Sequence, residues 1–105
     1  MREFNHVGIV TDQKHAGETF VPDCRAYITD FNSHPYRIEW CRIEAGSTLP
    51  EVLKKGLHLA FKVDDLDQEI AGKNVVLPPF SPMEGVRAAF IMSDDGVPIE
   101  LMQFS

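Results

Sequence analysis

Two short segments of this sequence begin with a histidine and continue as an apolar run. "HVGIVTD" starts at His6 and "HLAFKVDD" starts at His58. In both, a small residue, Gly8 or Ala60, follows two positions after the histidine. Because neutral imidazole is a common protein ligand for metal ions, the repeat suggests that both histidines serve one site.

A second repeat supplies two carboxylates. "RIEWCRI" aligns with "PIELMQF", which places Glu39 and Glu100 at matching positions. Side chains alternate between faces along a strand, so each glutamate shares its face with the apolar residues two and four positions later. A carboxylate on an apolar face is unfavourable unless it is neutralised, and one shared divalent cation would neutralise both.

Two imidazoles and two carboxylates form a mixed ligand set that suits Zn, Ni, Co, Fe or Mn without selecting among them. The sequence therefore predicts one divalent metal ion bound by His6, Glu39, His58 and Glu100. On an octahedral ion, two positions would remain for water or for two substrate oxygens. The alternative is that the histidines are hydrogen-bonded core residues and that the glutamates are exposed, because a slip of one residue inverts every side chain of a strand.

The elements that must position these side chains are mainly strands. Alternation and β-branched residues predict strands at Phe4–Val10, Cys24–Phe31, Tyr36–Glu44, Leu57–Val63, Val86–Ser93 and Val97–Phe104. Short helices are expected at Glu51–Lys55 and, after a capping box, at Leu66–Ala71. "NVVLPPF" is expected to be a strand cut short by its prolines, and "TDQKHAGETFVPD" to be a loop with at most one helical turn.

Size and composition indicate one ordinary globular domain. The chain has 105 residues, of which 44% are hydrophobic and 25% charged, and a formal net charge of −6. The negative charge argues against nucleic-acid binding, and no apolar run approaches the roughly 20 residues that span a membrane. Without a signal-peptide pattern the expected location is the cytoplasm, where Cys24 and Cys41 would remain reduced.

Three segments carry a family resemblance: "NHVGIVTD", "HLAFKVDDLD" and "AAFIMSDDGVPIELMQ". They resemble the vicinal oxygen chelate superfamily of glyoxalases, bleomycin-resistance proteins and extradiol dioxygenases. The nearest likeness is to the glyoxalase I and methylmalonyl-CoA epimerase branch. It covers Gly56–Gln103 almost completely and rests on "NHVGIVTD" and "RIEW" in the first half.

The resemblance implies an α+β fold in which paired βαβββ modules form a cup from curled mixed sheets. Within a single domain, 1–105, module one would span about 1–48 and module two about 53–105. Metal ligands are implied at the start of the first strand and in the last strand of each module. These are the same four residues that the repeats single out.

The first module departs from the family pattern. His6 and Glu39 are 33 positions apart, whereas His58 and Glu100 are 42 positions apart. The helix expected after the first strand is nearly absent, so the first module is truncated. Without this helix, an apolar surface of the sheet would remain exposed. We expect a second subunit to cover this surface in a homodimer.

The function implied by the resemblance is that of a metal-dependent lyase or isomerase of the glyoxalase I or methylmalonyl-CoA epimerase type. It would act by proton abstraction next to a metal-bound carbonyl, with Glu100 or Glu39 as the base. Glu at position 39 is typical of bacterial glyoxalases, whereas epimerases usually have Gln there. The substrate would be a small molecule such as a thioester or a glutathione or CoA adduct. Arg87 would hold its acidic tail, and Trp40 and Phe90 would line the pocket.

The alternative of a different class is a metal-free small-molecule-binding protein of the same fold, as in bleomycin-resistance-like sequestering proteins. Such proteins usually lack the full set of four ligands, so the ligand set here favours the enzyme. A ring-cleaving dioxygenase needs two histidines and one carboxylate, and Glu39 would over-fill its site.

Overall fold

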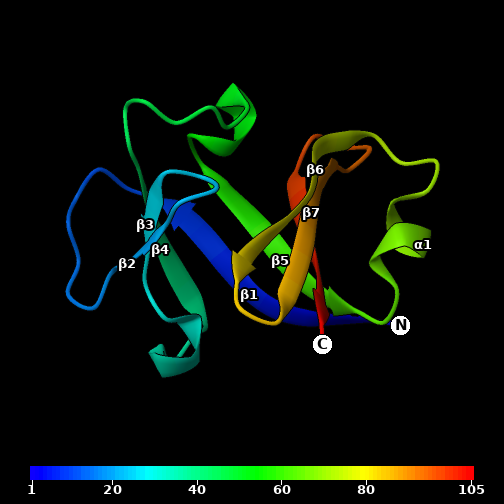
Figure 1. The fold of residues 1–105 in the computed structure, drawn as a ribbon, viewed down its shortest axis with the longest axis horizontal. Coiled ribbons are helices and arrows are strands. Elements are labelled where there is room, and N and C mark those ends of the chain that lie inside the picture. The colour runs from blue at the N-terminus through cyan, green and yellow to red at the C-terminus, as the bar shows by residue number, and fades with distance from the viewer.

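The structure is a computed structural model that describes residues 1–105. All eight strands join one mixed sheet, in the order β2-β3-β4-β1-β5-β8-β7-β6, which curls into an open cup (Figure 1). The strands are β1 (Arg2–Val10), β2 (Thr19–Val21), β3 (Ala26–Ile28), β4 (Ile38–Ile43), β5 (Leu57–Val63), β6 (Val75–Met83), β7 (Val86–Met92) and β8 (Pro98–Phe104). The helix α1 (Leu66–Ile70) and two 3-10 turns, Phe31–Ser33 and Glu51–Leu53, complete the secondary structure.

The two halves of the chain are arranged alike around the centre of the sheet. β1 and β5 pair antiparallel at the centre, β4 runs parallel to β1, and β8 runs parallel to β5. Outward from there, β3 and β7 pair antiparallel with β4 and β8, and β2 and β6 form the two edges. This architecture confirms the predicted α+β cup with a truncated first module, because the α-helix lies in the second half alone.

The helix α1 packs on the outer face of the second half of the sheet. Leu66 is fully buried there and packs with Val63, Ala89 and Leu101. The Asp65 side chain accepts a hydrogen bond of 3.2 Å from the Gln68 amide, which is the N-cap half of the predicted capping box. None of the helical segments has the length and apolar character needed to cross a lipid bilayer.

A loop takes the place of the missing helix on the outer face of the first half. The His15 ring stacks on Trp40 with 4.9 Å between ring centroids and an interplanar angle of 10°. Nearby, Arg42 and Glu18 form an ion pair of 2.7 Å. These contacts tie the loop between β1 and β2 to the outer side of β4.

The prediction was wrong for the first hairpin and for one helix. The expected strand Cys24–Phe31 is reduced to β3, and β2 lies inside the expected loop. Strands of three residues carry too little alternation to be recognised from sequence. The expected helix Glu51–Lys55 is a single 3-10 turn.

The sixth strand is longer than expected. β6 continues through Pro78, Pro79 and Pro82 instead of being cut short. β6 pairs with β7 alone, so along its other side a proline without an N–H group costs no hydrogen bond to a neighbouring strand. The register between β6 and β7 also shifts three times. An edge strand tolerates proline for these reasons.

Candidate metal centre

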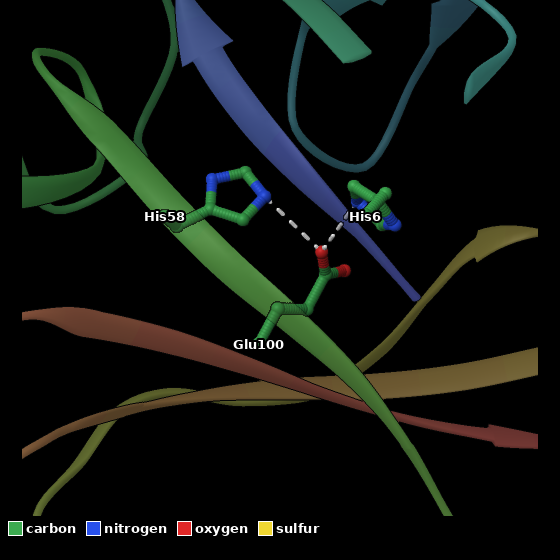
Figure 2. Close-up of side chains that lie close together, drawn as sticks. All are labelled: His6, His58 and Glu100. Carbon is green, nitrogen blue, oxygen red and sulfur yellow. Dashed lines mark ion pairs between the residues drawn. The ribbon is translucent and has the colours of Figure 1, made fainter. Parts of the chain in front are cut away.

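Four buried polar side chains converge inside the cup: His6 from β1, Glu39 from β4, His58 from β5 and Glu100 from β8. The Oε1 atom of Glu100 lies 3.5 Å from Nε2 of His6 and 3.2 Å from Nε2 of His58 (Figure 2). The Oε1 atom of Glu39 lies 3.5 Å and 3.9 Å from the same two nitrogens. The potential ligand atoms of His6, His58 and Glu100 all lie within 4.8 Å of one another, so this cluster could hold a metal ion.

The small residue after each histidine makes room for the imidazole of the other half. In the antiparallel pair of β1 and β5, Gly8 lies opposite His58, and Ala60 lies opposite His6. A Cβ on Gly8 would lie only 2.2 Å from Cε1 and 2.4 Å from Nε2 of His58. The repeated spacing in the sequence therefore reflects two imidazoles packed across the same central strand pair.

A β-bulge turns His6 into the cup. The register of β1 against β5 shifts between Phe4 and His6, which leaves Asn5 as the extra residue. Phe4 consequently packs edge-to-face on Phe61, with 6.0 Å between ring centroids. His6, two positions later, is instead buried among the other members of the cluster.

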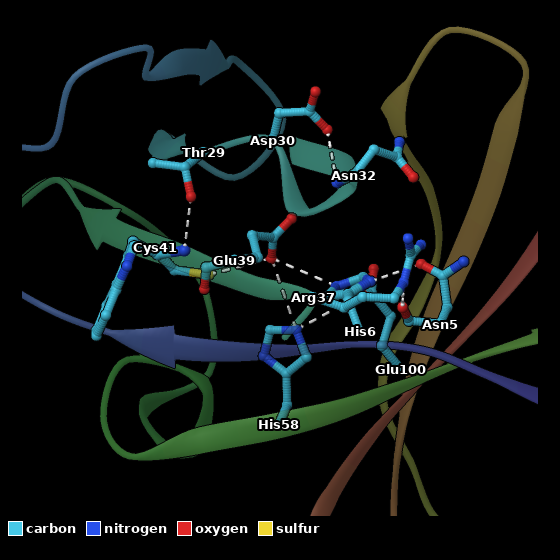
Figure 3. A network of polar contacts seen from close by, with 11 residues as sticks. Asn5, His6, Thr29, Asp30, Asn32, Arg37, Glu39, Cys41, His58 and Glu100 are labelled. Atoms are coloured by element: carbon cyan, nitrogen blue, oxygen red, sulfur yellow. Dashed lines mark hydrogen bonds and ion pairs between the residues drawn. The ribbon is translucent and has the colours of Figure 1, made fainter. Parts of the chain in front are cut away.

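Asn5 also orients the imidazole of His6. Its Oδ1 lies 2.7 Å from Nδ1 of His6. Because an amide oxygen only accepts hydrogen bonds, Nδ1 carries a proton and Nε2 is the ring nitrogen that faces the carboxylates and could bind a metal ion. The Phe31 ring stacks on His6 at 4.1 Å between ring centroids, and the Arg37 guanidinium lies over the Phe31 ring. Arg37 also donates through Nε to the main-chain oxygen of Asn5 (Figure 3).

The electrostatics of the cluster favour a bound cation. Burial lowers the pKa of His6, but the neighbouring carboxylates of Glu100 and Glu39 outweigh this effect and raise it to about 9. Burial raises the pKa of Glu100, but His58 and His6 outweigh this effect and lower it to about 2. Nε2 of both histidines is buried and makes no hydrogen bond. Two buried imidazole nitrogens that lie 3.2–3.9 Å from two carboxylates, without a hydrogen bond between them, form a donor set that fits a divalent transition-metal ion.

An apolar cavity of about 60 Å³ adjoins the cluster. Its polar wall is formed by Glu39, His58 and Glu100. The remaining lining residues are Val10, Val21, Cys24, Ala26, Ile28, Cys41, Ile43, Leu49, Leu53, Phe80, Pro82 and Phe90. The Phe90 ring contacts His58 edge-to-face at 4.9 Å, so this predicted pocket residue lies beside the cluster.

Both cysteines line the cavity as free thiols. Burial raises the pKa of Cys24 to about 12, and burial together with Glu39 raises the pKa of Cys41 well above its ordinary value. Cys41 Sγ donates to Oε1 of Glu39 at 3.2 Å. The thiols are therefore neutral, and Cys41 helps to hold the Glu39 carboxylate.

Arg87 and Trp40, which were also expected at the pocket, do not line this cavity. Each directly neighbours an inward residue in its strand and so points to the opposite face. The Arg87 guanidinium donates to Asp67 of α1 at 2.8 and 3.2 Å, and Trp40 stacks on His15 outside the sheet.

Sequence reasoning missed the residues that support His6. Asn5 precedes His6 directly, and this adjacency was the available signal for an outer hydrogen-bond partner. Phe31, which stacks on His6, lies in the 3-10 turn Phe31–Ser33, and Arg37, which contacts Phe31 and Asn5, directly precedes β4. No periodic pattern in the sequence marks either residue.

Comparison with known proteins supports the fold and does not assign a family. No protein-family model matches the chain, and no curated protein matches it. The crystal structure of a hypothetical protein from Bacillus halodurans C-125 is similar, with a TM-score of 0.76 and 18% sequence identity. The likeness covers 99% of this chain and 95% of that one. At this identity it shows the fold alone, and the curled mixed sheet is compatible with a glyoxalase-like fold.

Proposed function

We propose that this protein is a metal-dependent lyase or isomerase, of the glyoxalase I or methylmalonyl-CoA epimerase type, that moves a proton on a carbon next to a carbonyl group. One observation carries the proposal: two buried imidazole nitrogens without hydrogen-bond partners face two buried carboxylates beside a cavity. A metal ion bound there could act as a Lewis acid on a small molecule bound in the adjoining cavity.

His6, His58 and Glu100 would hold the ion, because their ligand atoms form the tightest group. Glu39 completes the set of four at 3.5 Å and 3.9 Å from the two imidazole nitrogens. When bound, a divalent ion such as Zn, Ni, Co, Fe or Mn supplies stabilisation of the negative charge that develops on substrate oxygens.

Glu39 is the group that we assign as the base. Its carboxylate lines the cavity and lies farther from His58 than the carboxylate of Glu100 does, 3.9 Å against 3.2 Å. A carboxylate held less tightly by the cluster can take a proton from the substrate carbon and return it. The Cys41 thiol keeps its Oε1 oriented, and the apolar walls of the cavity exclude water that would compete for the proton.

The apolar lining of the cavity favours a second candidate, a metal-free small-molecule-binding protein. Such a protein would use the cavity to sequester an apolar ligand, and its histidines would act as hydrogen-bonded core residues. It would bind no metal ion in stoichiometric amounts.

Metal content separates the two candidates. The protein is prepared without chelator or affinity tag and measured by plasma mass spectrometry beside His58→Ala, Glu100→Gln and the control Glu84→Gln, which alters an exposed carboxylate. We expect about one equivalent of a transition metal in the wild type and the control, and loss in both cluster variants. Absence of metal after reconstitution with Ni, Co, Zn, Fe and Mn would reject the enzyme and leave the binding protein.

A second measurement tests the base. Protein reconstituted with a divalent metal ion is assayed with hemithioacetals and acyl-CoA epimers. Exchange of the substrate proton with deuterated water is followed by NMR. Glu39→Gln should keep its metal and lose about 10²–10⁴-fold in exchange rate, which is the usual contribution of a positioned acid–base group. Unchanged exchange in Glu39→Gln would move the role to Glu100.

A further inference from the structure

We infer that this site selects a small ligand whose chain beyond the metal-binding atoms is short, apolar and uncharged, and that it discriminates against ligands with an anionic tail. The inference rests on the proposed metal site and deepens it by specifying the class of substrate. It replaces the expectation that Arg87 holds an acidic tail.

The cavity wall carries no basic group outside the metal cluster. No lysine or arginine lines the cavity. Its charged or ionisable groups are Glu39, His58 and Glu100, which belong to the metal cluster, and the two neutral thiols of Cys24 and Cys41. All other lining residues are apolar, so a ligand tail would contact only hydrocarbon and sulfur.

Most basic side chains of the protein are held away from the cavity. Seven of the ten lysines and arginines have a partner outside the cavity. The pairs are Arg2 with Glu69, Arg25 with Glu44, Arg37 with Phe31, Arg42 with Glu18, Lys54 with Glu51, Lys62 with Phe104, and Arg87 with Asp67. The structure therefore offers no cation at the cavity to pair with a carboxylate or phosphate.

The charges of the metal-bound site would already be balanced. The two positive charges of a divalent ion are matched by the carboxylates of Glu39 and Glu100. An additional negative charge on the ligand tail would be buried without a counter-charge, which is strongly unfavourable in an apolar environment.

The cavity is also small. It has a volume of about 60 Å³, whereas roughly 10–15 Å³ of such space already holds one water molecule. It therefore accommodates a few non-hydrogen atoms. A chain of a few carbons would contact apolar lining residues such as Leu49, Leu53 and Ile43, and a bulky carrier group would have to remain outside.

Two hydroxamates test this selectivity because they present the same pair of neighbouring oxygens. Butyrohydroxamic acid ends in a methyl group, and the monohydroxamate of succinic acid ends in a carboxylate on a chain of equal length. Both are titrated into the cobalt-loaded protein, and binding is read from the visible spectrum of the cobalt and from calorimetry. We expect the butyryl compound to bind at least tenfold more tightly.

A designed cation provides the matched variant. Leu49 lines the cavity and is only half-buried, so a long basic side chain can enter there while its stem remains packed. Leu49→Arg should reduce or reverse the preference for the butyryl compound, whereas Leu49→Met, which keeps the wall apolar, should still bind the butyryl compound more tightly than the succinyl compound. Equal or tighter binding of the succinyl compound by the unmodified protein would overturn the inference.

The outcome separates this inference from the proposed function. A protein that binds cobalt and prefers the butyryl compound but exchanges no substrate proton supports the selectivity and rejects the enzyme. If cobalt does not bind, the same two compounds are titrated into the metal-free protein and followed by the amide NMR signals of Glu39 and His58. A preference for the butyryl compound then supports the inference, and a preference for the succinyl compound, or none, overturns it.

Discussion

Gly8 tests the geometry of the metal centre most sharply, because replacement by alanine adds one methyl group at the imidazole of His58. The backbone of Gly8 is not in the left-handed region, so alanine fits its conformation. The new Cβ would lie 2.2 Å from Cε1 of His58, whereas ordinary contact begins at 3.4 Å, so the ring must move by about the difference of 1.2 Å. Metal–nitrogen bonds measure about 2.0–2.1 Å and tolerate about 0.2 Å, so this movement breaks the bond from His58.

The expected effect of Gly8→Ala is at least 100-fold weaker metal binding, or about 2.8 kcal/mol. The assay is a competition titration of cobalt or zinc against a chromophoric chelator. Overpacking typically lowers the free energy of unfolding by about 1–3 kcal/mol, so the variant should remain folded, which circular dichroism checks. Affinity within threefold of the wild type would refute the reasoning.

Two comparisons make this result specific. Gly46→Ala is a matched control, because its Cβ would meet the guanidinium of the exposed Arg25 side chain, with Nη1 nearest at 2.9 Å, and this side chain can move away. It should bind metal as the wild type does. The double variant Gly8→Ala/His58→Ala should bind no more weakly than His58→Ala alone, since the ligand is already displaced. If the losses in metal affinity of the two single variants added up in the double variant, Gly8 would affect metal binding by a route other than the position of His58.

Three further predictions address the surroundings of the site and the fold. Asn5→Ala should weaken metal binding by about 10–100-fold in the same titration because His6 loses its orienting partner, while Asn5→Asp should retain binding. The hydrogen bond from Arg42 lowers the pKa of Glu18 to about 2, below its usual 4.5, so the pair stabilises the fold above about pH 4.5 and this contribution is lost as the pH falls towards 2. Glu18→Gln should therefore lower the melting temperature at pH 7 and match the wild type near pH 2; a constant difference would contradict this. Leu66→Ala should lower the free energy of unfolding in urea by about 2–5 kcal/mol because it empties a fully buried site, and a loss below about 1 kcal/mol would refute that packing.

The central strands could be predicted from sequence because their patterns are long and repeated. Alternation alone placed Glu39 and Glu100 on the buried faces of their strands, and the structure brings both to the two histidines. The repeat also drew attention to Gly8, although its contact with His58 depends on the register of β1 against β5. Register between strands distant in sequence is a tertiary property that one strand's pattern does not contain.

The edges of the sheet and the outer contacts were less predictable. β2 is too short to show alternation, and the prolines of β6 read as strand breakers because its position at the edge depends on the whole topology. Arg87 was placed in the pocket from its position beside the last hairpin, whereas its strand turns it outward towards Asp67 of α1. Asp67 becomes its partner only once α1 has packed on the outer face of the sheet.

The order of the strands predicts that amide hydrogen exchange is slow in one part of the site and fast in another. The four clustered side chains stand on the four central strands β4, β1, β5 and β8, whereas Val21 and Phe80 of the cavity wall stand on the edge strands β2 and β6. An edge strand is hydrogen-bonded along one side only, so its amides open with a smaller free energy than those at the centre. Hydrogen exchange should therefore be slowest around His6 and His58 and fastest along β2 and β6. Ligands would then reach a rigid set of metal-binding groups by way of the fraying margins of the sheet.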